Sequence, residues 1–235
     1  SKNNMAKLSL LSLLAIVLLS CNSLKKVEDD DYLVIKNVIY ADSIKVNNEE
    51  LESLIYQKSN STVLGYPLRL NLYNLAKENT DSSYNAWLYR KENRKKRLDN
   101  LLSEKQVERL GESFLVKGLS NWLKDIGEEP TILDTTKTRL SLAKLSAYYQ
   151  SKGYFTNNTS YEIDSAKRKK AKVNYHIELG DPYIIDSLGN NISSTAIDSL
   201  YFLNSAQSLI KEGQQFDLSN FNGERERLTG IFRNS

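Results

Sequence analysis

The part of the sequence that most restricts the fold is one long amphipathic stretch followed by two short alternating ones. Asp134 or Thr135 can cap a helix that continues with apolar residues at three- and four-residue spacing and ends at Gly153. Residues 159–163 and 172–179 then alternate apolar and polar positions, and a polar, basic turn at residues 164–170 separates them. The pattern predicts a helix packed against a β-hairpin.

The same periodicities indicate which side chains this unit buries. The helix is expected to bury Leu140, Leu142, Leu145, Tyr148 and Tyr149. On the second strand we expect Val173, Tyr175, Ile177 and Leu179 to face inward, with Asn174, His176 and Glu178 facing outward.

The residues before this unit predict further elements. Residues 32–40 are β-branched and aromatic and predict a strand, and a helix begins near residue 48 with Asn47 or Asn48 as its cap. Residues 63–76 alternate leucines with polar residues and predict an extended segment, whereas residues 84–126 have helical spacing. Within that helical region, Ser103 and Gln106 resemble a capping box. After the hairpin, a further strand is expected at residues 183–188. The order strand, helix, insertion, helix, strand, strand predicts an α+β fold with helices on one face of a small sheet.

Composition excludes several classes of protein. The 235 residues are 40% hydrophobic and 26% charged, which suits one or two globular domains, and a net charge of +3 gives no case for nucleic acid as a partner. With one His, one Cys and no phosphate-binding glycine loop, we expect no catalytic site, no metal and no cofactor. His176 is expected to be a surface residue, and Glu128 and Glu129 to serve a helix end.

The first residues have the order of a secretion signal. Lys2 and Lys7 precede an apolar run at residues 8–19, which is too short to span a bilayer, and Ser20-Cys21 follows. This order resembles the signal peptide and lipobox of bacterial lipoproteins, which implies cleavage between Ser20 and Cys21 and acylation of Cys21. The alternative is a buried apolar helix that ends in a cysteine.

Two charged segments remain open to more than one interpretation. Residues 21–31 end in four acids and are expected to form a solvated tether, with a surface-export signal as the alternative. The basic run at residues 90–97 is either a solvated helix face or a patch for anionic lipid or an acidic partner.

The sequence contains an internal repeat. Residues 127–132 are echoed by residues 213–218, and residues 145–152 by residues 228–235. In the first copy Gly153-Tyr154-Phe155 follow, so we expect glycine and an aromatic residue to follow Ser235 in a longer chain.

A family resemblance follows from these motifs in this order. A β-α-α-β-β unit whose second helix ends in residues 148–155 (YYQSKGYF), and whose last strand enters residues 180–184 (GDPYI), resembles a POTRA domain. With the lipobox and residues 64–76, 102–106 and 122–134, the chain is similar to TamL-like lipoproteins of the BamA and TamA family of outer-membrane assembly barrels. The resemblance implies a signal peptide (1–20), a lipidated tether (21–31), a first POTRA-like domain (32–181, helical insertion at about 63–126) and a truncated second one (182–235). It also implies a C-terminal β-barrel beyond this sequence.

The resemblance also implies a function and a binding site. The protein would be the periplasmic region of an outer-membrane protein assembly or translocation factor, anchored in the outer membrane by the lipid. The residue after Cys21 is Asn22 and not Asp, which agrees with a location in the outer membrane. Its partners would be unfolded outer-membrane proteins or a TamB-like periplasmic protein, recruited by β-augmentation at an edge strand formed by Thr159, Ser160, Tyr161, Glu162 and Ile163. The alternative is a lipid-anchored structural or scaffold lipoprotein that handles no clients.

Overall fold

The computed structural model describes residues 23–78 and 117–234, together with ten single residues between them (86, 88, 90, 96, 97, 101, 103, 105, 106 and 109). The chain forms two compact units. Unit 1 comprises Ser1–Ile35, Lys58–Leu133 and Ser165–Ala171, and unit 2 comprises Lys36–Gln57, Asp134–Asp164 and Lys172–Ser235.

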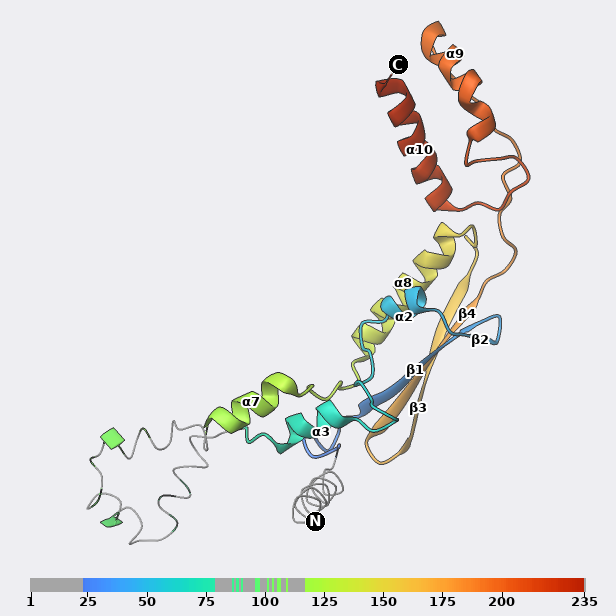
Figure 1. Cartoon of the computed structure of the whole chain (residues 1–235). Helices are drawn as coiled ribbons and strands as arrows, with labels where there is room; N and C mark the ends of the chain where they lie inside the picture. Colours follow the sequence, from blue (N-terminus) through green and yellow to red (C-terminus); the bar gives the residue numbers. More distant parts are fainter. Residues whose placement is uncertain are drawn as a thin grey trace, which may run out of the picture. The chain divides into compact units, whose positions relative to one another are not determined.

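The strands form one mixed sheet in the order β2-β1-β4-β3 (Figure 1). The strands are β1 (Leu33–Ala41), β2 (Ile44–Val46), β3 (Asn158–Lys167) and β4 (Lys170–Glu178). β2 pairs antiparallel to β1, with Ile39 opposite Val46. The predicted α+β class, the first strand and the closing hairpin are confirmed. β2 was not predicted from the sequence.

Two tight turns with left-handed backbone explain why the ends of the strands on either side of them were not predicted from the sequence. Asp42 and Ser43, between β1 and β2, have φ values of 46° and 67°, and Arg168 and Lys169, between β3 and β4, have 33° and 58°. Two residues with positive φ make the turn that suits an antiparallel hairpin, but the usual Asn-Gly signal is missing at both places. The second turn is therefore shorter than the one predicted at residues 164–170.

Helix α8 (Thr135–Ser151) supplies the core of unit 2. Asp134 is its N-cap, accepting from the backbone N–H groups of Thr136 and Lys137, and Gly153 ends it with a φ of 94°. Both predicted ends are confirmed. Its buried positions are Thr138, Ser141, Leu145 and Tyr149, and the buried residues of β4 are Ala171, Val173, Tyr175 and Ile177.

The prediction for the apolar side of α8 was wrong at Leu140, which is 47% exposed. Two small hydroxyl residues take the buried positions instead. Thr138 Oγ1 donates to Asp134 O at 3.0 Å and Ser141 Oγ to Lys137 O at 2.8 Å, so their burial leaves no unpaired hydroxyl. Small side chains there leave room for Tyr175, which is fully buried beside them.

Helix α2 (Glu49–Ser53) begins where the sequence predicted. Asn48 is its N-cap, and its side chain accepts from Glu50 N at 2.8 Å. Leu51 and Ile55 are buried, and Tyr56 N donates to Ser141 Oγ at 2.9 Å, which ties the end of this segment to α8.

Unit 1 contains a helix where the sequence predicted an extended segment. Residues 68–75 form α3 (Leu68–Leu75), which packs against α7 (Leu119–Ile126). The prediction was wrong because the buried face of α3 consists of Leu70, Asn71 and Asn74. Two buried asparagines remove the apolar period that marks a helix. The helical prediction holds for α7, while most of residues 84–116 lie outside the described residues.

The asparagines are buried because the N-terminal segment packs on them. Ser23 Oγ donates to Asn71 Oδ1 at 3.0 Å, and Asn74 Nδ2 donates to Ser23 O at 3.1 Å. Val27 joins a small core with Leu33 and Leu70. Of the predicted solvated tether, the acids Glu28, Asp29 and Asp30 are exposed, but the residues from 23 to 27 fold onto α3. That part of the prediction was wrong.

Glu128 and Glu129 were predicted to stabilise a helix end, but the structure gives them other hydrogen-bond partners. Glu128 accepts hydrogen bonds from the backbone N–H and the hydroxyl of Ser61, and Glu129 accepts one from the Tyr73 hydroxyl at 3.0 Å. Both carboxylates therefore join the segment after α7 to distant parts of unit 1.

Residues 183–188 were predicted as a strand, but only one isolated bridge forms there, between Ile184 and Gln215. A strand needs a paired neighbour over several residues, and here the pairing is limited to hydrogen bonds between residues 183–185 and 213–216. The segment continues into α9 (Thr195–Asn204), η2 (Ser205–Gln207) and α10 (Leu218–Arg233).

The predicted internal repeat has a structural counterpart in α8 and α10. Asp217 is the N-cap of α10 as Asp134 is of α8. A bridge precedes each cap by two residues, Leu33 to Ile132 in the first case and Ile184 to Gln215 in the second. The preceding glycine lies seven residues before Asp134 but four before Asp217, so the two segments before the caps differ by three residues in length. The sequence alignment of residues 127–132 with 213–218 was therefore out of register, whereas that of 145–152 with 228–235 was correct.

A candidate partner-binding edge strand

β3 is the last strand in the order of the sheet, so only β4 pairs with it among the described strands. The predicted edge residues lie in it. Thr159, Tyr161 and Ile163 are half-buried, while Ser160 and Glu162 are exposed. Successive N–H and C=O groups of such a strand point alternately toward the neighbouring strand and away from it. Among the described strands, one side of the β3 backbone therefore has no neighbouring strand.

The start of β3 is held in place by Asn157, a residue that the sequence analysis did not single out. Ser146 Oγ donates to Asn157 Oδ1 at 2.7 Å, and Asn157 Nδ2 donates to Tyr154 O at 2.7 Å and to Ser146 O at 3.2 Å. These bonds tie the loop before β3 to α8. The one sequence signal for this role was the position of the asparagine between an aromatic loop and a strand.

The aromatic residues of that loop extend the support. Tyr149 and Tyr154 meet edge to face with ring centroids 6.1 Å apart, and Phe155 contacts Tyr183 and Phe216, each at 5.1 Å. Burial, and then the neighbouring Tyr148 and Tyr154, raises the pKa of Tyr149. The edge strand thus starts from a packed loop instead of a free one.

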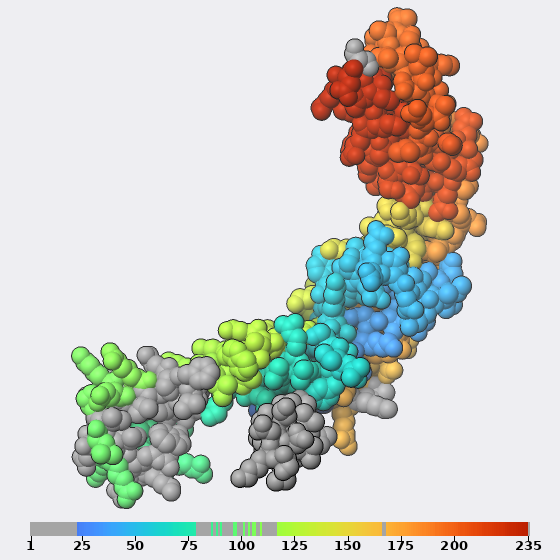
Figure 2. Space-filling model, in the orientation of Figure 1, coloured from blue at the N-terminus to red at the C-terminus, as the bar shows by residue number. Residues whose placement is uncertain are grey.

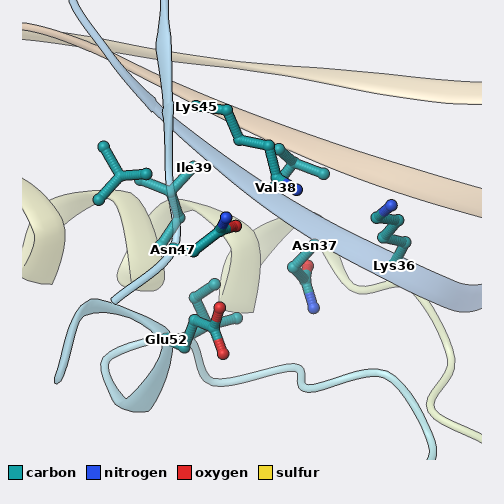
Figure 3. A pocket seen from close by; sticks show the side chains of 9 residues that line it. Lys36, Asn37, Val38, Ile39, Lys45, Asn47 and Glu52 are labelled. Atoms are coloured by element: carbon teal, nitrogen blue, oxygen red, sulfur yellow. The ribbon is translucent and has the colours of Figure 1, made fainter. Parts of the chain in front are cut away.

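A small polar pocket lies at the opposite end of the sheet, between β1, β2 and α2 (Figure 3). It has a volume of about 140 Å³ and is lined by Lys36, Asn37, Val38, Ile39, Lys45, Val46, Asn47, Glu52 and Ile55. Asn37 Nδ2 donates to Gln57 O at 2.8 Å, while its buried Oδ1 has no hydrogen-bond partner in the part of the chain that the structure describes. The pocket is smaller than sites for drug-sized ligands and suits a few water molecules.

The other predicted sites fall into two groups. Ser20 and Cys21 lie outside the described residues, as does most of the basic run at 90–97. His176 is on the predicted side of β4 but is half-buried, because its ring stacks on Tyr40 at 5.1 Å with an interplanar angle of 7°.

Metal sites and membrane-spanning helices are two further features that a chain of this kind could contain. Over the part of the chain that the structure covers, no three His, Cys, Asp or Glu side chains converge as metal ligands would. Nor does any helix in residues 23–78 and 117–234 combine the length and hydropathy required of a membrane span.

No protein family, curated protein or solved structure was found to match the chain.

Proposed function

We propose that the protein is a POTRA-type recruitment module of an outer-membrane assembly or translocation factor, and that it binds extended segments of its partners by β-augmentation at β3. The observation that carries this proposal is the position of β3 at the end of the sheet. The strand is ten residues long, contains neither proline nor glycine, and starts from a loop fixed by Asn157.

Backbone pairing explains how one site could accept many partners. Main-chain hydrogen bonds supply the affinity in β-augmentation, and they depend little on the partner's side chains. Unfolded barrel proteins and a long β-rich protein of the TamB kind both offer extended segments. The half-buried Thr159, Tyr161 and Ile163 alternate with exposed positions, so a segment paired with β3 would continue one covered and one open face of the sheet.

We also propose where in the cell the protein is located. We propose that residues 1–20 are removed as a signal peptide and that the lipid on Cys21 holds the module at the periplasmic side of the outer membrane. The short apolar run between Lys7 and Ser20-Cys21 supports this. Intact mass of the mature protein tests it, because acylation of Cys21 adds the mass of the acyl chains.

A labelled ten-residue strand peptide from an outer-membrane β-barrel protein tests the edge directly. We expect the full chain to bind this peptide and to lose binding when alternate backbone nitrogens of the peptide are methylated, since methylation removes the N–H donors. Equal binding of both peptides would contradict β-augmentation and leave the alternative, a lipid-anchored scaffold without client handling.

A pair of proline variants supplies the matched control on the protein. Of Tyr161→Pro and Glu162→Pro, one removes an N–H group bonded to β4 and the other an N–H group that faces outward. We expect one variant to unfold at lower temperature, and the other to keep its unfolding temperature but bind the peptide more weakly. If the normally folded variant binds with unchanged affinity, β3 is not the site.

A further inference from the structure

The residues that directly follow the predicted lipidation site are fixed on α3. Besides the two hydrogen bonds between Ser23 and the asparagines of α3, Lys25 Nζ donates to Asn74 O at 2.9 Å. Val27 is buried and Leu24 packs against the same core. From Ser23 onward the chain therefore has no free spacer.

This docking limits how far unit 1 can lie from a lipid on Cys21. Only Asn22 lies between Cys21 and Ser23, and a fully extended chain covers about 7 Å over these two residue steps. A bilayer that holds the lipid must then lie close to the C-terminal end of α3, where Asn74 is located. This step rests on the proposed acylation of Cys21.

The same end of α3 carries exposed apolar side chains. Leu75 is 40% exposed, and on α7 Leu119 and Trp122, one turn apart, are 39% and 50% exposed. Lys77 N donates to Ser120 Oγ at 3.3 Å, which joins the end of α3 to the start of α7. Figure 2 shows α3 (teal) and α7 (yellow-green) next to each other on the molecular surface. We call Leu75, Leu119 and Trp122 the α3–α7 surface.

Positive charge accompanies this surface. Lys25 and Lys77 are exposed. The half-buried Lys26 lies over the Tyr73 ring, with its Nζ 4.3 Å from the ring centroid and 3.9 Å from Glu78 Oε1. Burial lowers the pKa of Lys26, and the nearby Lys124 and Lys25 lower it further while Glu78 raises it. Lysines beside an exposed tryptophan are typical of surfaces that meet the headgroups of an anionic membrane.

We propose that the α3–α7 surface rests on the membrane that carries the Cys21 lipid, with Trp122 at the level of the headgroups and Lys25 and Lys77 near the lipid phosphates. The lipid and this surface then act as two attachments of one unit, which fixes how unit 1 faces the bilayer.

Fluorescence of Trp122 tests the proposal. The sequence has two tryptophans, so Trp87→Phe leaves Trp122 as the only one, and Trp122→Phe in the native chain gives the same signal by difference if the first variant folds poorly. The acylated full-length protein is reconstituted in vesicles of three parts phosphatidylethanolamine to one part phosphatidylglycerol, with and without brominated acyl chains. We expect bromine to reduce Trp122 emission about twofold, since a ring at the headgroups reaches the upper acyl chain.

Matched variants and the mass of the anchor separate the outcomes. Leu119→Asp should relieve most of the quenching, whereas Leu64→Asp, a fully exposed leucine before the N-terminal end of α3, should not. Acyl chains on Cys21 together with unquenched Trp122 would overturn this inference and leave the proposed anchor intact. An unacylated Cys21 would overturn the anchor and, with it, the inference.

Discussion

Lys152 Nζ lies 3.0 Å from Asp217 Oδ2, so the residue that ends α8 is ion-paired with the residue that caps α10. Gln215 Nε2 also donates to Lys152 O at 2.6 Å. The two helices of the internal repeat are thus joined end to start by the side chains of the residues at the C-cap position of α8 and the N-cap position of α10.

Substitutions at Asp217 should separate its two roles. Asp217→Asn keeps a side-chain oxygen for the cap but removes the charge, and should cost about 0.5–1 kcal/mol of unfolding free energy because the pair is partly exposed. Asp217→Ala also removes the cap, and should cost about 1 kcal/mol more. Urea unfolding measures both. Asp134→Ala, at the N-cap of α8, is the control for the loss of a cap alone. Equal costs for Asn and Ala at position 217 would contradict the capping role.

Gly153→Ala should destabilise the protein more than Gly213→Ala. Both glycines have positive φ, 94° and 79°, so each alanine pays about 1–2 kcal/mol of backbone strain. At Gly153 a Cβ would also lie 2.8 Å from Phe216 O, whereas nothing lies within 4 Å at Gly213. Thermal unfolding of the two variants isolates the cost of that close approach. Similar unfolding temperatures would show that residue 216 moves away without cost.

The stability of the C-terminal segment should fall in acid because of Glu224. Its carboxylate accepts from Arg227 Nε at 2.9 Å and Nη2 at 2.6 Å, and from Leu209 N at 3.0 Å. Arg227 foremost, against the opposing effect of burial, lowers the pKa of Glu224 from 4.5 to about 2. A depressed pKa stabilises the folded state above the unfolded pKa, by at most about 3 kcal/mol here, and this stability is lost as pH falls from 4.5 toward 2.

Hydrogen exchange of α10 amides between about pH 5 and 3 measures this loss, once corrected for the intrinsic pH dependence of exchange. In Glu224→Gln the protection of α10 should be lower at pH 5 and nearly independent of pH. The exposed neighbour Glu226→Gln should behave as the native chain does. A native pH profile in Glu224→Gln would assign the acid sensitivity to another group.

Tyr175→Phe should cost little stability at neutral pH. The side chain is fully buried, but among the described residues its hydroxyl finds no hydrogen bond of good geometry, although it lies near Ser141 and Thr138. Removal of an unsatisfied buried hydroxyl is close to neutral or stabilising. Urea unfolding compares this variant with Tyr32→Phe at an exposed position. A loss above about 2 kcal/mol would mean that the hydroxyl has a firm partner.

The same residue should contribute to alkaline unfolding. Burial raises the pKa of Tyr175 in the folded protein. The contribution of the neutral phenol to folding stability is therefore complete below the tyrosine pKa of the unfolded chain, near 10, and is lost as the pH rises above that pKa. The native chain should therefore lose more stability than Tyr175→Phe between about pH 9 and 11. Parallel losses would contradict the burial of the phenol.

The sequence by itself determined the elements whose signals are local. Asp134 and Gly153 mark the two ends of α8, and alternating apolar and polar residues define β3 and β4. Both signals are local because caps and periodicity depend on residues close along the chain. The sequence also predicted that α8 and α10 are related.

Only the tertiary structure decided the features that depend on distant partners. Asn71 and Asn74 are buried because Ser23 reaches them from 48 and 51 residues away, so α3 lacked the apolar period of a helix. Residues 183–188 remain short of a strand because pairing, rather than propensity, makes one. The position of β3 at the edge likewise follows from the order of the whole sheet, which no local pattern contains.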